Sequence, residues 1–253
     1  MIGSTRQLVA IPLWACLLLL GVLAFGAASS HDDQPGKLEA TTIPLDTMNG
    51  LEVLGISEKG AVPVKIQSGV GDYRGRRAVR LVNDDGPAGA VSGGQVLAII
   101  KGSDFEDGTI EADIAGFARQ GAKPSTRGFI GVAFRVQDHG SRYEAFYLRM
   151  TNGRTDDQLR RNHSAQYVSQ PEFPWNRLRQ ESPGVYESYV DIDPERWTRI
   201  KIVVSGTKAQ LYVNGADQPC LIVNDLKLGV SRGQIALWTG SDTEAYFSNL
   251  TIR

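Results

Sequence analysis

The densest group of side chains that could grip or cleave a ligand lies in the segment 159–179, LRRNHSAQYVSQPEFPWNRLR. Aromatic rings stack on the apolar faces of sugar rings, whereas arginine and amide side chains grip hydroxyl or carboxylate groups. His163 can act as an acid or base near neutral pH and is the candidate catalytic residue. The ligand-binding candidates in this segment are Arg160, Arg161, Asn162, Tyr167, Trp175 and Arg177.

The length of the surrounding connection also indicates a function. Residues 152–196 separate two predicted strands by about forty residues, far more than the usual ~4–6 residues of a connection. The segment carries too many aromatic and aliphatic side chains to remain disordered. We expect part of it to pair as strands, over Ala165–Gln170 and Val185–Val190. The alternative is a packed insertion in which Trp175 plugs a sheet edge and the arginines pair with nearby acids.

Two neighbouring segments, Phe129–Val136 and Tyr143–Met150, supply further candidates. Both alternate with period two, so every second side chain shares one face of the sheet. One face combines small residues with residues that reach outward, as the floor of a groove would. The outward residues are the predicted ligand-binding residues Arg135, Tyr147 and Arg149, and the small ones are Gly131, Ala133 and Ala145. The alternative is that the small residues ease sheet curvature while the arginines are merely exposed.

Other chemistries have little support in the residue spacing. Glu111 and Asp113 alternate like the carboxylates of laminarinase-type glycosidases, but Gly116 stands where the partner carboxylate is needed. Beyond residue 30, Cys220 is the single cysteine, which excludes an intramolecular disulfide and a cysteine metal cage. The acidic turns lack the spacing of a calcium loop. We predict no metal-binding residue and no cofactor, although a structural calcium ion is compatible with the fold.

The elements that must position these residues are strands. Alternating segments recur along the chain between Asp-Gly and Asn-Gly turns, and no ten-residue stretch after the first thirty has a helical period. This pattern predicts an all-β, two-sheet antiparallel sandwich. The other predicted strands are Val62–Gln67, Ala78–Val82, Thr109–Ile114, Thr198–Val204, Ala209–Val213, Gln234–Trp238 and Ala245–Ile252.

The first thirty residues have the order of a secretory signal peptide. Arg6 precedes a long apolar run, which small residues end before His31. An uncleaved membrane anchor is the alternative, since the run is almost long enough to span a bilayer. We predict a signal peptide over 1–30, a single domain over 31–253, with 31–66 as an N-terminal extension or edge strands, and a secreted or periplasmic location.

The charge of the mature chain is close to neutral. Arg6 is the one charged residue in 1–30, so 26 basic residues face 28 acidic residues, and the net charge becomes −2. A field of this size favours neither nucleic acid nor an anionic membrane. We therefore expect no nucleic-acid partner, and membrane contact only through an uncleaved N-terminal segment.

The region 104–253 resembles the concanavalin A-like lectin/glucanase jelly roll, and within it the laminin-G-like bacterial domains of the 3-keto-disaccharide hydrolase family. The resemblance covers most of the mature chain and rests on fold motifs. It implies ligands in a concave groove or at a loop rim, and its members include lectins, carbohydrate-binding modules, glycosidases and lyases. The segments that carry it are Phe105–Ile114, Gly128–Arg135, Tyr143–Arg149, Trp197–Val203, Leu211–Gly215, Gly233–Trp238 and Ala245–Leu250.

Three functions follow as hypotheses. The first is a secreted domain that binds a glycan on the concave face and the 152–196 insertion. The second is a glycoside hydrolase or lyase acting on 3-keto-glycosides, with His163 as base and arginines steadying an enolate. The third is a protein-adhesion module, since arginine exceeds acid within 159–179. The sequence does not decide between binder and enzyme, nor does it give the oligomeric state.

Overall fold

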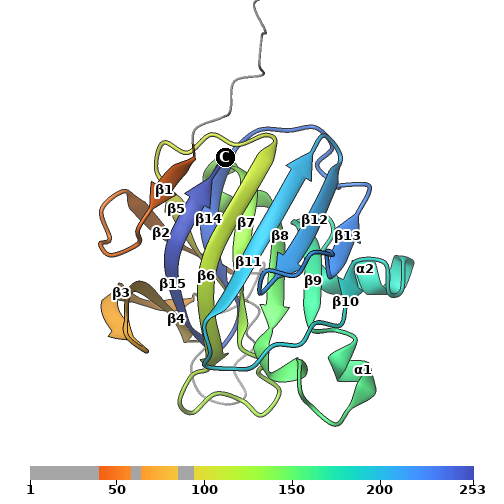
Figure 1. Ribbon diagram of the computed structural model, residues 1–253, viewed down its shortest axis with the longest axis horizontal. Helices are drawn as coiled ribbons and strands as arrows, with labels where there is room; N and C mark the ends of the chain where they lie inside the picture. The colour runs from red at the N-terminus through yellow and green to blue at the C-terminus, as the bar shows by residue number, and fades with distance from the viewer. Residues whose placement is uncertain (1–39, 58–63, 85–93) are drawn as a thin grey trace, which may run out of the picture. The chain divides into compact units, whose positions relative to one another are not determined.

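The computed structural model describes residues 40–57, 64–84 and 94–253 (Figure 1). Leu38–Arg253 form one unit by their internal contacts. The predicted signal peptide 1–30 lies outside the described residues. Within the described ranges, no helix is long and apolar enough to cross a membrane.

One layer is an eight-stranded sheet in which every ladder is antiparallel. In Figure 1 its central strands lie in front of the second layer. Its strands, in spatial order, are β13 (Leu221–Val223), β12 (Lys208–Val213), β11 (Thr198–Ser205), β6 (Gly108–Ala118), β15 (Thr243–Ile252), β4 (Arg76–Asp84) and β3 (Lys65–Tyr73), with β1 (Thr41–Ile43) paired to β15.

The second layer is a seven-stranded antiparallel sheet, and it carries the candidate site. Its strands, in spatial order, are β10 (Glu187–Ser188), β9 (Ala165–Gln170), β8 (Arg142–Arg149), β7 (Phe129–Gln137), β14 (Gln234–Thr239), β5 (Gln95–Ile100) and β2 (Leu51–Ile56). The predicted all-β, two-sheet antiparallel jelly roll is therefore confirmed.

The core between the layers comes from the period-two alternation. Ile130 faces β6 so closely that a Cβ on Gly116 would lie 2.8 Å from its side chain. Phe134 and Phe146 stack with ring centroids 6.2 Å apart on the same inner face. The other face of the seven-stranded sheet, which carries Tyr147, points away from the eight-stranded sheet, and we call it the open face. The alternation rule did not select β5, because its residues 96–100 are all buried and leave no polar face.

The residues of 31–66 that the structure describes supply strands to both sheets. β2 is the last strand of the seven-stranded sheet and β3 the last of the eight-stranded sheet, while β1 pairs with β15. Residues 31–39 and 58–63 of this region lie outside the described part of the chain.

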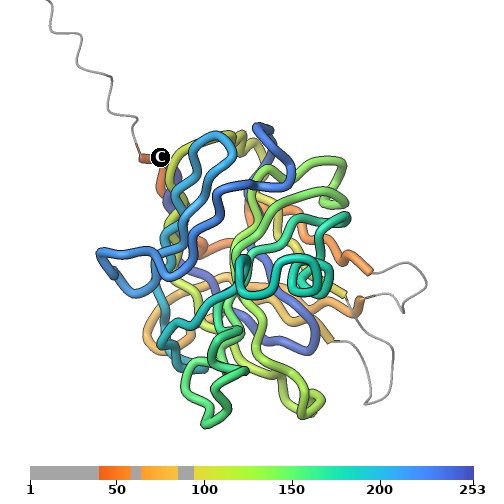
Figure 2. The backbone as a smooth tube through the Cα atoms, turned by 90° about the vertical axis from the view of Figure 1, so that its right-hand side faces the viewer, coloured from red at the N-terminus to blue at the C-terminus, as the bar shows by residue number. Residues whose placement is uncertain are grey.

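The long connection 152–196 is folded and forms the β10–β9 edge of the seven-stranded sheet (Figure 2). It contains α1 (Gln158–Arg161), β9, α2 (Trp175–Glu181) and β10. Two single-turn 3-10 helices, η1 (Asp138–Gly140) and η2 (Met150–Asn152), flank β8. β9 spans the predicted Ala165–Gln170, whereas the predicted Val185–Val190 shortens to β10. Both helices are shorter than the ten-residue window in which helical period was sought. Asp157 caps α1 by accepting a hydrogen bond from the backbone of Arg160 at 3.1 Å.

A bulge in β7 reverses the direction of one important side chain. The pairing of β7 with β8 shifts between Phe134 and Gln137, and Arg135 takes a φ of 53°. An extra residue in one strand turns the following side chain to the opposite face. Arg135 consequently points between the two sheets instead of onto the open face.

Candidate functional site

An aromatic platform forms the floor of the open face. Tyr147 of β8, Gly131 of β7 and Trp238 of β14 lie in one row across three paired strands. Because Gly131 has no side chain, the rings of Tyr147 and Trp238 lean over it and stack with centroids 4.6 Å apart. A Cβ on Gly131 would lie 2.7 Å from that of Tyr147 and 2.1 Å from the Phe146 carbonyl oxygen. Gly131 therefore serves close packing, and neither it nor the buried Ala133 and Ala145 lines either of the two pockets described below.

A pocket of about 270 Å³ opens over this platform, and we call it the aromatic pocket. Trp175, the first residue of α2, forms one wall and remains 45% exposed. The volume lies just below the ~300–1,000 Å³ of pockets for drug-sized ligands, which suits a single sugar ring. Its lining residues are Gly94, Gln95, Phe129, Tyr147, Val168, Gln170, Pro174, Trp175, Trp238, Gly240 and Ser241.

Polar groups hold the platform in place. The indole N–H of Trp238 donates to the Tyr143 hydroxyl at 3.1 Å, and that hydroxyl donates to the side-chain oxygen of Gln95. Tyr143 is fully buried, and burial raises its pKa. The pocket thus joins an apolar floor to amide groups at its edge, the combination that fixes the orientation of a small polar ligand.

Arg149 connects the aromatic pocket with the insertion. Its guanidinium donates to the Tyr147 hydroxyl and to Gln166 Oε1, both at 3.0 Å, and to the His163 backbone carbonyl at 2.9 Å. It also lies 5.9 Å from the centre of the Trp175 ring. Tyr147 and Arg149 therefore share the open face, as the alternation of β8 predicted.

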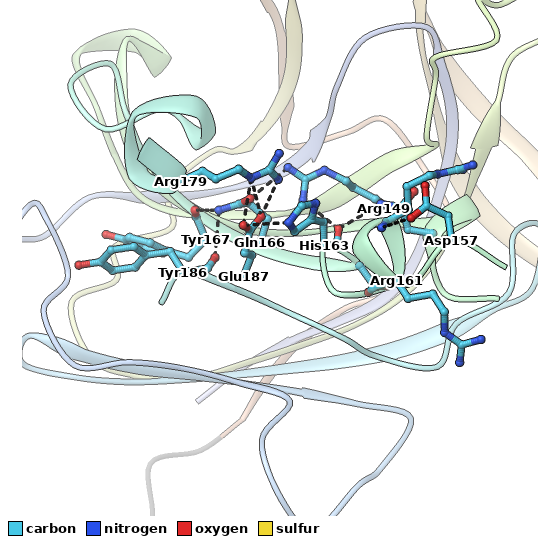
Figure 3. A network of polar contacts seen from close by, with 12 residues as sticks. Arg149, Asp157, Arg161, His163, Gln166, Tyr167, Arg179, Tyr186 and Glu187 are labelled. Atoms are coloured by element: carbon cyan, nitrogen blue, oxygen red, sulfur yellow. Dashed lines mark hydrogen bonds and ion pairs between the residues drawn. The ribbon is translucent and has the colours of Figure 1, made fainter. Parts of the chain in front are cut away.

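A second, more open pocket of about 710 Å³ lies beside Arg149, and we call it the histidine pocket. His163 Nε2 lies 3.2 Å from Glu187 Oε1, and Arg179 holds Glu187 through both carboxylate oxygens (Figure 3). Arg179 also lies 4.8 Å from the Trp175 ring centre, so the two pockets adjoin. The lining residues are Leu159, Asn162, His163, Arg179, Pro183, Gly184, Glu187, Ser188 and Tyr189.

The surroundings favour a neutral His163. Burial lowers its pKa; Glu187 acts in the opposite direction, while Arg179 and Arg149 add to the lowering. A neutral imidazole that donates Nε2–H to Glu187 keeps Nδ1 as a proton acceptor. His163 thus has the protonation state that a general base requires.

The other candidates of the insertion surround the histidine pocket or lie beyond it. Asn162 lines it, and its side-chain oxygen accepts from Gln158 at 2.7 Å. Arg161 donates to the Tyr189 hydroxyl at 2.8 Å. Arg160 has a buried Nε without a hydrogen-bond partner among the described residues.

Arg177 behaves as the packed-insertion alternative expects. It pairs with Glu181 at 2.8 Å and its guanidinium covers the Phe173 ring at 4.2 Å. It lines neither pocket. Trp175, in contrast, does not plug a sheet edge, because nearly half of it stays exposed.

Two predicted ligand-binding residues are in the core. Arg135 is 0% exposed, because the β7 bulge turns it inward to pair with Glu144 at 3.3 Å and Asp107 at 3.2 Å. Tyr167 is also 0% exposed and donates to Glu144 Oε1 at 2.7 Å. Its register partner Phe146 faces the core, so period two places Gln166, opposite Tyr147, on the open face instead. Both residues are structural, and neither belongs to the site.

Sequence reasoning missed Trp238, Arg179 and Glu187. Trp238 was used only as a mark of the fold, although its alternation with Leu237 shows that one of the two leaves the core. Glu187 and Arg179 meet through a turn that no periodicity reveals. Among the described residues no three His, Cys, Asp or Glu side chains lie close enough to hold a metal ion.

Comparison with known proteins places this arrangement in a family. A family model described as 3-keto-alpha-glucoside-1,2-lyase-like domain matches residues 65–253. No curated protein matches the chain. A lichenase (β-1,3-1,4-glucanase) derived from a mouse hindgut metagenome is similar in structure, with a TM-score of 0.50, 13% identity, and coverage of 84% of this chain and 98% of the lichenase.

Two further solved structures are similar to this chain at lower TM-scores. The carbohydrate-binding module CBM66 from Bacillus subtilis has a TM-score of 0.47 at 14% identity and covers 77% of this chain and 98% of its own. The exoplasmic/lumenal domain of VIP36, in a form bound to Ca²⁺ and mannose, has a TM-score of 0.48 at 10% identity, covering 76% and 83%. At this level of identity, the similarity to the lichenase shows a shared jelly-roll fold.

Proposed function

We propose that this chain, which belongs to the 3-keto-alpha-glucoside-1,2-lyase-like domain family, binds a glycoside with one sugar ring in the aromatic pocket. The observation that carries the proposal is that the half-exposed ring of Trp175 lines one pocket together with the stacked and largely buried rings of Tyr147 and Trp238. We also propose that the protein is located outside the cytoplasm, where its site would meet extracellular glycans.

The chemistry of the pocket supports a sugar over an apolar ligand. A pyranose presents C–H groups on one face and hydroxyl groups around its rim, so it needs an aromatic surface together with amide donors and acceptors. Trp175 supplies the surface, while Gln95 and Gln170 supply amides at the edge. A pocket for a purely apolar ligand would not need these amides.

Calorimetric titration of the purified protein with glycosides tests the proposal. Trp175→Ala should weaken binding about fivefold or more, since stacking on an aromatic ring contributes roughly 1 kcal/mol and the pocket wall disappears with it. Ile222→Ala is the matched control, because Ile222 is 47% exposed on β13, outside both pockets, and should bind like the wild type. Equal binding by the wild type and Trp175→Ala would exclude the aromatic pocket as the sugar site.

A second function, cleavage of 3-keto-glycosides, is favoured by the neutral His163 held on Glu187. A ketone at C3 makes the C2 proton acidic, and a base at C2 removes it. The electron pair forms a C1–C2 double bond as the C1–O bond breaks and the aglycone leaves with the bonding pair. His163 Nδ1 would take the C2 proton.

Turnover of a 3-keto-glycoside separates this reaction from binding alone. His163→Ala should lose turnover while it keeps the affinity for the unreactive parent glycoside, because the sugar contacts lie in the aromatic pocket. Glu187→Gln, which leaves the imidazole without its carboxylate partner, should reduce turnover less. Turnover by His163→Ala at the wild-type rate would remove His163 from the mechanism and leave the binding proposal intact.

A further inference from the structure

Arg149 is a buried cation whose hydrogen-bond partners are all neutral. It is 6% exposed, and its three hydrogen bonds go to a backbone carbonyl, a hydroxyl and an amide oxygen. No carboxylate lies within 4.0 Å of it among the described residues. Arg135, on the adjacent strand, shows the usual solution for a buried arginine, because it pairs with both Glu144 and Asp107.

The charges around Arg149 do not balance it. Arg127, Arg160 and Arg179 lie near enough to interact with it or with one another, and the acids among them are Glu187 and Asp157. With His163 neutral, four cations face two anions, so the group carries a net charge of +2. Arg179 and His163 already occupy Glu187, and Asp157 caps α1. No carboxylate in this group is left for Arg149.

Two more details indicate a missing anionic partner. Burial, followed by the charges of Arg160 and Arg149, lowers the pKa of Arg127. The Nε of Arg160 is buried without an acceptor in the described part of the chain. Burying like charges together costs free energy unless an opposite charge or a ligand compensates them.

We propose that the sugar bound in the aromatic pocket carries a small oxyanion, the carboxylate of a uronic acid or a sulfate or phosphate ester, and that this group lies against Arg149. This inference rests on the proposed sugar site. Arg149 touches Tyr147 and approaches Trp175 of the aromatic pocket, and it binds the backbone of His163 in the histidine pocket. An oxyanion on the ring would thus lie between the two pockets, where the uncompensated charge is.

Paired ligands test the inference on the full protein. Methyl glucoside, methyl glucuronide, glucose 6-sulfate and glucose 6-phosphate are titrated against wild type, Arg149→Met, Arg149→Lys and Arg232→Met. Arg232 is the matched control, because it is a paired, exposed arginine that lines neither pocket. A hydrogen-bonded charge pair at a desolvated site should make the preferred acidic ligand bind about tenfold to a hundredfold tighter than methyl glucoside.

The expected pattern is specific. Wild type and Arg232→Met prefer one acidic ligand, and the preference falls as salt is added. In Arg149→Met the ratio between the affinities for the acidic ligand and for methyl glucoside falls to about one. The acidic ligand that binds best identifies the oxyanion. Arg149→Lys, which keeps the charge and a similar length, keeps a salt-dependent part of the preference and shows that the effect does not come from misfolding.

Two results overturn the inference. Equal affinity of the wild type for neutral and acidic sugars refutes it and leaves the proposed function standing, provided that Trp175→Ala still weakens binding. A preference that survives in Arg149→Met refutes the assignment to Arg149. Absence of binding by every sugar, in contrast, refutes the proposed function itself.

Discussion

Replacing Arg135 with methionine should destabilise the fold strongly and should not act through the site. The side chain is fully buried, and its guanidinium donates to the backbone carbonyls of Glu106, Gly206 and Gly229 at 3.0, 2.7 and 2.6 Å in addition to its two ion pairs. Without it, Glu144 stays buried with only Tyr167 and the Leu228 N–H. Burial already raises the pKa of Glu144. Breaking a buried pair from one side costs about 3–5 kcal/mol, a large part of the ~5–15 kcal/mol that stabilises a typical domain.

Urea unfolding followed by circular dichroism measures this cost. Arg135→Met should lower the midpoint strongly, whereas Arg135→Met combined with Glu144→Gln should recover part of the loss, because no uncompensated charge remains in the core. Arg232→Met, an exposed paired arginine, should change the free energy of unfolding by less than about 1 kcal/mol. If Arg135→Met keeps wild-type stability and loses sugar binding, the reasoning is wrong and Arg135 belongs to the site after all.

Three further predictions concern single residues. Gly131→Ala should lower both the stability of the fold and the affinity for sugar, because a Cβ would collide with the Phe146 carbonyl and push Tyr147 off Trp238. Gly69→Ala is the control, because the space around its Cβ is open. Equal effects of the two substitutions in urea unfolding and titration would contradict this prediction. The pKa of His163 in the folded protein lies below 6.5, so the folded state binds fewer protons at this residue than the unfolded chain does. Wild type should therefore lose stability relative to His163→Gln as the pH falls below 6.5. Parallel curves of unfolding free energy against pH for the two proteins would contradict the lowered pKa. Burial raises the pKa of Cys220 to about 11. In a Cys16→Ser background, the Cys220 thiol should therefore react with a disulfide reagent far more slowly than free cysteine at a pH of about 8.5. Equal reaction rates would contradict the burial of this thiol.

Alternation predicted the fold because a residue in a sheet faces either the core or the open side. It gave most strands and placed Tyr147 and Arg149 on one face. It failed at Arg135, because a bulge of one residue reverses every face after it, and the sequence FIGVAFRVQ carries no mark of where the extra residue falls. Tyr167 was misassigned for a related reason: β9 alternates, but only its register with β8 decides whether Gln166 or Tyr167 faces outward.

The site depended on contacts that no local pattern encodes. The glycine in FIGVAF was noticed as a small residue, yet its role follows only from the row that it forms with Tyr147 and Trp238 across three strands. Likewise, the histidine was selected for its type, while its carboxylate partner lies 24 residues later in a two-residue strand. Residue type gave the candidates, and strand pairing decided which of them meet.

The central claim is that one sugar ring occupies the aromatic pocket, and a crystal structure of the protein with a bound glycoside tests it most directly. The account predicts a pyranose in van der Waals contact with the Trp175 ring, above Tyr147 and Trp238, with hydroxyl groups toward Gln95 or Gln170. A sugar bound instead on the outer face of the eight-stranded sheet, for example against Trp197, with the aromatic pocket empty, would contradict it.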